Sequence, residues 1–146
     1  MNTLSIKEIA FGSKDYRKAL AIREEVLREP LELSFSQEEL KEDLDDIHIS
    51  GFSKNAMIGT LILSSQNEET IRLRQIAVCS DFQRKSIGKK LVEFGETVAK
   101  GREYRKIILF SQEYVVPFYA NLDYSVYEDR FESVTLPHFC MQKQLV

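Results

Sequence analysis

The feature that most constrains the fold is a strand-like apolar run at 71–78 that leads through a short loop into a helix. In the helical pattern that follows, Ile87, Leu91 and Phe94 share one face. The first N–H groups of a helix lack partners within the helix, and the helix dipole favours negative charge there. The loop and the first turn also carry four basic residues: Arg84, Lys85, Lys89 and Lys90. This combination predicts a site for a phosphate or pyrophosphate group.

Hydrophobic periodicity and turn residues predict alternating strands and helices along the chain. Strands are expected at 4–10, 47–53, 56–64, 70–78, 106–111, 125–131 and 139–145. Helices are expected at 15–27, 36–44, 86–100 and 115–121, the second beginning at a capping box at 36–39. This order needs helices on both faces of one mixed central β-sheet, an α/β (α+β) architecture. With no repeat or linker in the pattern, residues 1–146 are expected to form a single domain.

The composition limits the classes of partner. A chain of 146 residues with 43% hydrophobic side chains can bury a core, and 29% charged residues give an ordinary soluble surface. The net charge of −3 argues against a protein that binds nucleic acid by general electrostatics. The basic residues at 84–90 are a local exception to that acidic balance.

Three further features indicate a reducing cytoplasm and no metal. Cys79 and Cys140 lie in strand-like runs, so buried free thiols are expected rather than a disulfide framework. No apolar run approaches the roughly 20 residues of a membrane span, and the N-terminus lacks the apolar segment of a secretory signal. His48 and His138 are far apart with no cysteine pair near them, which gives no metal-site spacing.

The loop and the C-terminal third resemble one known family. The order strand, Q-x-x-S-x-G, helix, with Gln83 and Gly88 at its ends, is similar to the acyl-CoA-binding motif of the GCN5-related N-acetyltransferase (GNAT) superfamily. Ser86 and Asp123 stand where the family usually has glycine. The rest of the resemblance is carried by Gln112, Pro117-Phe118-Tyr119, Asn121-Leu122-Asp123-Tyr124, Phe131-Glu132, Leu136-Pro137-His138 and Met141. The match covers residues 70–146 well, and over 1–69 it extends to the order of elements alone.

The resemblance implies a fold, a co-substrate and site residues. The implied fold is the GNAT one, in which neighbouring strands splay apart and the thioester lies in the gap. Acetyl-CoA is the implied co-substrate, held by main-chain groups of the 70–78 strand and by the loop. The implied cofactor-binding residues are Ile76, Val78, Gln83, Arg84, Lys85, Ser86, Ile87, Gly88 and Lys89. Tyr119 is the implied catalytic residue, a general acid that protonates the departing thiolate.

Each assignment has a simpler alternative. Ile76 and Val78 are also ordinary core positions, and the basic residues can form a solvated helix face. Tyr119 can pack beside Phe118 in an aromatic cluster. Many relatives use a glutamate on the 70–78 strand as the base, but this strand carries Arg72, Arg74 and Gln75, which either receive an acidic substrate group or face solvent. The remaining candidates for the base are Glu25, Glu29, His48, Glu132 and His138.

The leading hypothesis is an acetyl-CoA-dependent N-acetyltransferase that transfers the acetyl group directly to a primary amine in a ternary complex. A non-catalytic acyl-CoA-binding module is the alternative, and a nucleic-acid-binding domain is disfavoured by the acidic charge. The acceptor is a small-molecule amine, a peptide N-terminus or a lysine side chain. Whether the chain forms a homodimer is left open, and no membrane partner is expected.

Overall fold

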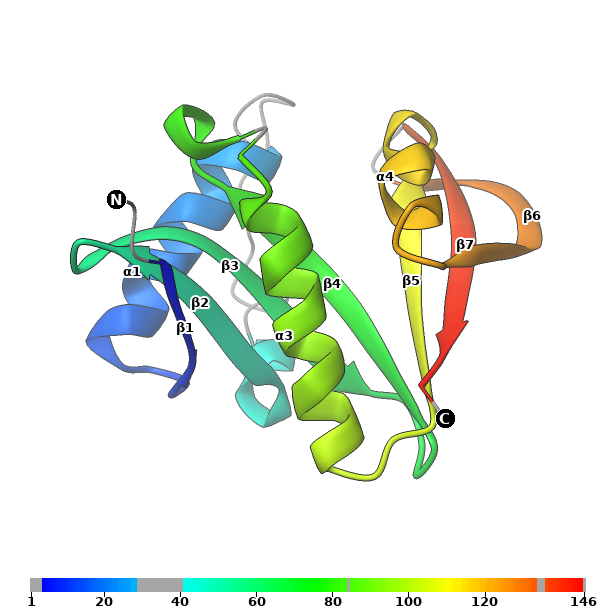
Figure 1. The fold of residues 1–146 in the computed structure, drawn as a ribbon, viewed down its shortest axis with the longest axis horizontal. Helices are drawn as coiled ribbons and strands as arrows, with labels where there is room; N and C mark the ends of the chain where they lie inside the picture. The colour runs from blue at the N-terminus through cyan, green and yellow to red at the C-terminus, as the bar shows by residue number, and fades with distance from the viewer. Residues whose placement is uncertain (1–3, 29–40, 84, 134–135, 146) are drawn as a thin grey trace.

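A seven-stranded mixed sheet forms the centre of the protein (Figure 1). The computed structural model describes residues 4–28, 41–83, 85–133 and 136–145. The strands are β1 (Leu4–Ile9), β2 (Ile47–Ser53), β3 (Ala56–Ser65), β4 (Thr70–Val78), β5 (Lys106–Gln112), β6 (Ser125–Ser133) and β7 (Leu136–Gln144). Their order across the sheet is β1-β2-β3-β4-β5-β7-β6. The β4–β5 pair is parallel and the other neighbours are antiparallel.

Helices cover both faces of this sheet, as predicted. In Figure 1, α3 (Ile87–Gly101) crosses the front of β2–β4, and α1 (Lys14–Arg23) lies behind them. The short helix α4 (Val116–Ala120) follows β5 near the far end of that strand. One mixed sheet with helices on both faces is the architecture that the resemblance implied.

The central helix is positioned by a core that spans α3 and β2–β4. Leu91 and Val92 are fully buried, and they lie against Ile49, Leu61 and other apolar side chains of these strands. Gly59 of β3 permits this close approach, because a Cβ there would lie 2.9 Å from the Leu91 side chain. The apolar stripe predicted for this helix is thus the stripe that holds it against the sheet.

Several predicted boundaries differ from the structure. The helix expected at 15–27 is α-helical through Arg23 and continues as a π-helical turn, Glu24–Arg28. The capping box at 36–39 lies outside the described residues, and Glu42–Asp45 is a 3-10 turn rather than α-helix. β6 and β7 extend further than predicted toward each other.

Both cysteines are free thiols, as expected. Cys140 is buried in β7, whereas Cys79 follows the end of β4 and is half-buried. Burial raises the pKa of the Cys79 thiol, with a further contribution from the charge of Glu25. No helix within the described parts of the chain is long and apolar enough to cross a membrane.

Candidate active site

β4 and β5 pair over a short stretch and then diverge. Parallel pairing ends at Arg72 and Ile108, although β4 continues to Val78 and β5 to Gln112. The two strands separate toward the start of α3 and toward α4 (Figure 1). Beyond Arg72, the edge of β4 that faces β5 pairs with no strand within the described residues. This open edge can hydrogen-bond the amide groups of an extended ligand.

A β-bulge interrupts β4 beside this opening. Ile62 of β3 lies opposite Arg74, but Thr60 lies opposite Ala77, so β4 holds one extra residue here. Gln75 has a φ of 55°, in the left-handed region that non-glycine residues adopt at a cost. Bulges concentrate next to active sites, where they redirect a side chain or end a pairing.

The spacing of the apolar residues along β4 reflects this bulge. Ile71 and Leu73 occupy odd positions, whereas Ile76 and Val78 occupy even ones, and all four lie in or against the core. One face of a regular strand takes every second residue. The change of phase therefore requires an extra residue between Leu73 and Ile76. The strand predicted at 70–78 is confirmed, and the bulge within it gives Gln75 a special position that the prediction did not include.

The start of α3 leaves its first N–H groups available. Ser86 is the N-cap residue and has a φ of 63°, and its side chain makes no capping hydrogen bond. The first helical bond runs from Lys90 N to Ser86 O at 3.1 Å. The N–H groups of Ile87, Gly88 and Lys89 precede it, and a left-handed N-cap does not cover them. An anion can therefore accept hydrogen bonds from this turn.

The loop before α3 is anchored to β4. The Gln83 side chain donates a hydrogen bond to the Val78 carbonyl oxygen at 2.9 Å. Lys85 places its Nζ 5.6 Å from the centre of the Phe82 ring. Lys85, Ser86 and Lys89 are exposed, so their polar groups can reach a ligand.

The structure thus brings together the described members of the predicted cofactor-binding set, at the end of β4 and the start of α3. Arg84 lies outside the described residues. Ile76 and Val78 pack against the core, and the Ile87 side chain is 9% exposed. These three residues can therefore contact a ligand through main-chain atoms, while their side chains serve the core.

Gly88 brings the start of α3 close to α4. A Cβ at Gly88 would lie 3.4 Å from the Phe118 ring, at the lower limit of ordinary van der Waals contact. The turn after α4 is equally compact: Asp123 has a φ of 74°, and Tyr124 N donates to the Tyr119 carbonyl oxygen at 3.1 Å. A left-handed residue after a helix is usually glycine. Ser86 and Asp123 therefore both adopt the backbone conformation that explains the glycines at these positions in the family.

Tyr119 is buried on the inner side of α4. Its side chain is 4% exposed and packs edge-on against Phe118, with ring centres 5.0 Å apart, and against Tyr124 at 5.7 Å. The aromatic cluster is therefore present. Burial raises the pKa of Tyr119, which keeps the phenol protonated at neutral pH. A protonated phenol at this position can donate a hydrogen bond to a ligand.

Tyr124 connects this cluster to α3 and β7. Its hydroxyl donates to Glu96 Oε2 at 2.8 Å, and Lys143 Nζ is 2.9 Å from Glu96 Oε1. Burial and the neighbouring Glu96 raise the pKa of Tyr124. These contacts join α3 to the β5–β7 half of the sheet, across the point where β4 and β5 separate.

The candidates for a general base differ in their burial and in their placement in the fold. His48 is 3% exposed, and its Nε2 lies 2.8 Å from the Asp43 carbonyl oxygen, behind the Tyr16 ring. That placement is structural. Glu25 is exposed, and its charge adds to the burial that raises the pKa of the half-buried Cys79 thiol at the end of β4. His138 is partly buried on β7, opposite Gln112 of β5. Glu29 and the Glu132 side chain lie outside the described part of the structure.

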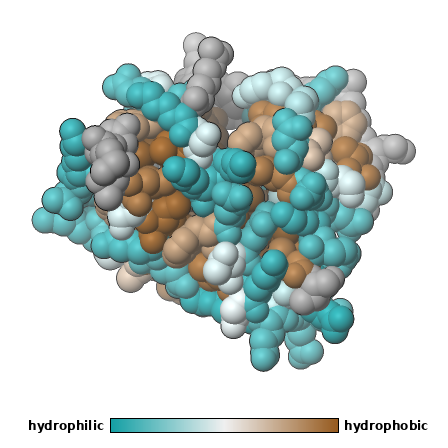
Figure 2. Space-filling view, viewed as in Figure 1, coloured by the Kyte–Doolittle hydropathy of each residue, from teal (hydrophilic) through white to brown (hydrophobic). Residues whose placement is uncertain are grey.

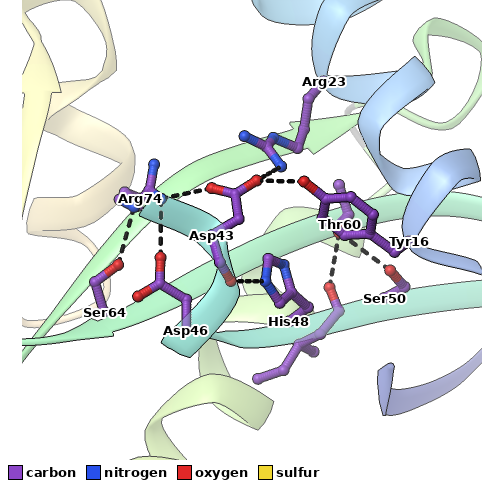
Figure 3. A network of polar contacts seen from close by, with 10 residues as sticks. Tyr16, Arg23, Asp43, Asp46, His48, Ser50, Thr60, Ser64 and Arg74 are labelled. Atoms are coloured by element: carbon purple, nitrogen blue, oxygen red, sulfur yellow. Dashed lines mark hydrogen bonds and ion pairs between the residues drawn. The ribbon is translucent and has the colours of Figure 1, made fainter. Parts of the chain in front are cut away.

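A buried polar network occupies the other face of β4 (Figure 3). Asp43 is fully buried and accepts from Tyr16 Oη, Arg23 Nη1 and Arg74 Nη2, each at 2.8 Å. Arg74 also pairs with Asp46 at 2.9 Å. Burial alone would raise the pKa of Asp43, but the hydrogen bonds from Arg23 and Tyr16 outweigh it and hold the pKa below its ordinary value.

This network corrects one expectation about the substrate. Arg74 is already paired with two protein carboxylates, and its side chain is 13% exposed. Arg72 places its guanidinium 4.1 Å from the centre of the Phe110 ring. Arg74 is therefore not available to receive an acidic group of a substrate, and it does not simply face solvent either.

Two cavities lie outside the opening between β4 and β5. One, of about 410 Å³, is lined by residues of β1, α1 and the β2–β3 turn, among them the exposed Lys7, Lys18 and Lys54. A smaller one of about 90 Å³ lies on the β1 side of α3 and is lined in part by Leu4 and Ile87. Figure 2 shows the apolar area there, bordered by hydrophilic side chains. Within the described residues, no group of three His, Cys, Asp or Glu side chains could hold a metal ion.

Comparisons with known proteins agree with this geometry. The model of the acetyltransferase (GNAT) domain matches residues 18–145. A protein from Lactobacillus plantarum that carries the provisional name N-acetyltransferase has a similar structure, with a TM-score of 0.88 and 22% identity, covering 99% of this chain and 100% of that one. An acyl-CoA N-acyltransferase from Pseudomonas aeruginosa gives a TM-score of 0.82 and 18% identity, covering 98% and 99%.

A third similar structure has a ligand. It is a GNAT family acetyltransferase from Elizabethkingia anophelis with acetyl-CoA bound, with a TM-score of 0.76, 16% identity and 97% of each chain covered. At these identities the structural likeness establishes the fold. The family model spans most of the chain, from residue 18 to residue 145. The chain therefore belongs to the GNAT acetyltransferase family.

Proposed function

We propose that this protein is an N-acetyltransferase that moves the acetyl group of acetyl-CoA directly to a primary amine in a ternary complex. One observation carries the proposal: the left-handed Ser86 leaves the N–H groups at the start of α3 open, at the end of the unpaired edge of β4. Backbone donors for a phosphate thus lie next to a strand edge that can pair with amide groups. An acyl-CoA has both parts: a pyrophosphate that fits the donors and an amide-containing arm that fits the edge.

In this proposal, separate groups of residues bind the two parts of acetyl-CoA. The N–H groups of Gly88 and Lys89, with the Lys85 and Lys89 side chains, bind the pyrophosphate. The open edge of β4 at Ile76 and Val78 binds the amide-containing arm through main-chain atoms. Acetyl-CoA supplies a thioester, whose carbonyl carbon the amine nitrogen attacks.

Tyr119 completes the transfer. As the carbon–sulfur bond breaks, the electron pair goes to sulfur and the Tyr119 hydroxyl gives sulfur its proton, after which the phenolate regains a proton from solvent. The raised pKa of this buried phenol keeps it protonated before the reaction. The nitrogen loses its extra proton to solvent or to a base, for which Glu25 and His138 are the described candidates.

The free thiols of Cys79 and Cys140 support a reducing cytoplasm as the working compartment.

The acceptor class and the reaction are tested by one experiment. Free-thiol release from acetyl-CoA is followed with ethanolamine, Nα-acetyl-lysine and a tripeptide with a free N-terminus. Acetyl-CoA at 100 times its Kd should also stabilise the fold by about 2.7 kcal/mol and raise the Tm. Lys89→Gln should reduce that shift, whereas Lys100→Gln, at the other end of α3, should preserve it. Absence of both the shift and thiol release would refute the proposal.

A non-catalytic acyl-CoA-binding module is the second candidate. It is favoured by the composition of β4, which has no carboxylate in Thr70–Val78 to act as a base. A thermal shift with acetyl-CoA, without thiol release for any amine, would support this candidate. Binding of nucleic acid that weakens steeply with salt would contradict both candidate functions.

A further inference from the structure

Gln75 carries a buried hydrogen-bond acceptor that pairs with none of the described residues. Its Oε1 is shielded from solvent and receives no hydrogen bond from any described residue. Buried amide oxygens are nearly always paired, since an unpaired one forfeits its hydration without compensation. An exception of this kind requires a reason.

The backbone of Gln75 is also held in an unfavourable conformation. Two of the other left-handed residues, Lys54 and Asn55, form the turn between β2 and β3, and Glu103 follows the end of α3. Turns and helix ends commonly need such a conformation. Gln75 lies at the β-bulge inside β4, where neither a turn nor a helix end accounts for its φ of 55°. Strain of this kind tends to gather at ligand-binding sites.

The neighbours of Gln75 fix it in place. Arg74 is bound by Asp43, Asp46 and Ser64, at 2.8 to 2.9 Å. On the other side, Ile76 packs against the core. The bulge is therefore anchored at both ends, and it lies on the part of β4 that has separated from β5. An acceptor fixed in this way is preorganised for a partner that arrives later.

We propose that Gln75 is a ligand-binding residue, whose Oε1 accepts a hydrogen bond from an N–H group of a ligand lying between β4 and β5. The inference rests on the proposed function, in which two groups of this chemistry occupy the opening: an amide N–H of acetyl-CoA and the acceptor amine. An amide oxygen binds either one but takes no proton at neutral pH. Gln75 therefore orients the donor and is not the general base.

The test replaces Gln75 with methionine, which preserves the length of the side chain and removes its polar atoms. Gln66→Met makes the same chemical change at an exposed turn and serves as the matched control. Acetyl-CoA affinity is measured by calorimetry, and KM by thiol release with whichever of the three amines above the unsubstituted protein uses fastest. Tm is measured for each variant without ligand.

We expect Gln75→Met to keep or raise the Tm, because it removes an unpaired buried polar group, and to lose about three- to tenfold in ligand affinity. A rise in the Kd of acetyl-CoA identifies its amide as the donor. An unchanged Kd with a raised KM for the amine identifies the amine. A side chain that merely supported the fold would lower the Tm instead, which would overturn the inference.

Gln75→Gly provides a second variant that is expected to fold, because glycine adopts a φ of 55° without strain. It should show the same loss of affinity. Unchanged Kd and KM in either folded variant, relative to Gln66→Met, would also overturn the inference. If the unsubstituted protein binds acetyl-CoA but turns over no amine, transfer activity fails while the Kd comparison still decides the role of Gln75.

Discussion

Arg74 on β4 donates to the fully buried carboxylate of Asp43 at 2.8 Å, and this contact ties the central strand to the segment that precedes β2. The same carboxylate accepts hydrogen bonds from Arg23 and Tyr16 of α1. α1 is thereby fixed to the face of the sheet opposite α3, and β4 is held in position next to its bulge.

Removing this carboxylate should be costly. Asp43→Asn removes the buried negative charge that Arg23 and Arg74 both contact at 2.8 Å, and breaking a buried pair in this way costs about 3–5 kcal/mol. Asp46→Asn is the matched control, because Asp46 contacts Arg74 at a more exposed position. Denaturant unfolding of both variants measures the difference. Equal losses would show that burial of Asp43 does not set its contribution.

Asp43 also predicts how stability depends on pH. Its pKa is lowered in the folded protein, so the unfolded chain binds the proton more readily, near the ordinary value of about 3.9. The stabilisation is present above that value and is lost as the pH falls through the lower folded pKa. Unfolding free energies measured from pH 6 down to pH 2 should show this loss. In Asp43→Asn that part of the slope should disappear.

Ser86 offers a test of the anion site. Ser86→Gly relieves the left-handed backbone, so acetyl-CoA affinity should stay equal or improve. Ser86→Asp should weaken binding about tenfold through repulsion of the phosphate. Ser86→Asn is its neutral control, since both residues tolerate the left-handed region. Calorimetry with acetyl-CoA checks all three, and equal affinity of the Asp and Asn variants would place the phosphate elsewhere.

Tyr119→Phe separates proton donation from packing. If the hydroxyl protonates the departing thiolate, kcat and kcat/KM should fall together by about 100-fold, with acetyl-CoA affinity unchanged. The ring remains, so the Tm should stay close to that of the parent. Tyr114→Phe, which removes a hydroxyl from a residue that is 80% exposed, should leave the kinetics unchanged. Full activity of a folded Tyr119→Phe protein would rule out the acid role.

The sequence predicted what depends on local pattern. The strands, the central helix and the basic loop at its start follow from apolar spacing and from the chemistry of helix ends, and the structure has them. The Asp43 network was out of reach because its partners lie 20 to 31 residues away, and no local rule pairs Asp43 with Arg23 or Arg74. The bulge could have been predicted from the sequence, because the apolar residues move from odd to even positions between Leu73 and Ile76.

The site was predicted as a set of residues, but the conformation that makes it usable was not. Ser86 and Asp123 were noted as replacements for glycine, and the structure shows why glycine is usual there. Both retain the left-handed backbone despite their side chains. The unpaired oxygen of Gln75 depends on three-dimensional neighbours and leaves no trace in spacing or composition.

The short pairing of β4 with β5 has a consequence for motion. Pairing stops at Arg72, so the amide hydrogens of β4 beyond it that face β5 lack the protection that a neighbouring strand provides. Without a ligand, these hydrogens should exchange with deuterium faster than those of β3, whose strand has a partner on each side. An extended ligand along this edge would act as the missing strand and slow the exchange, so the sheet is completed by what it binds.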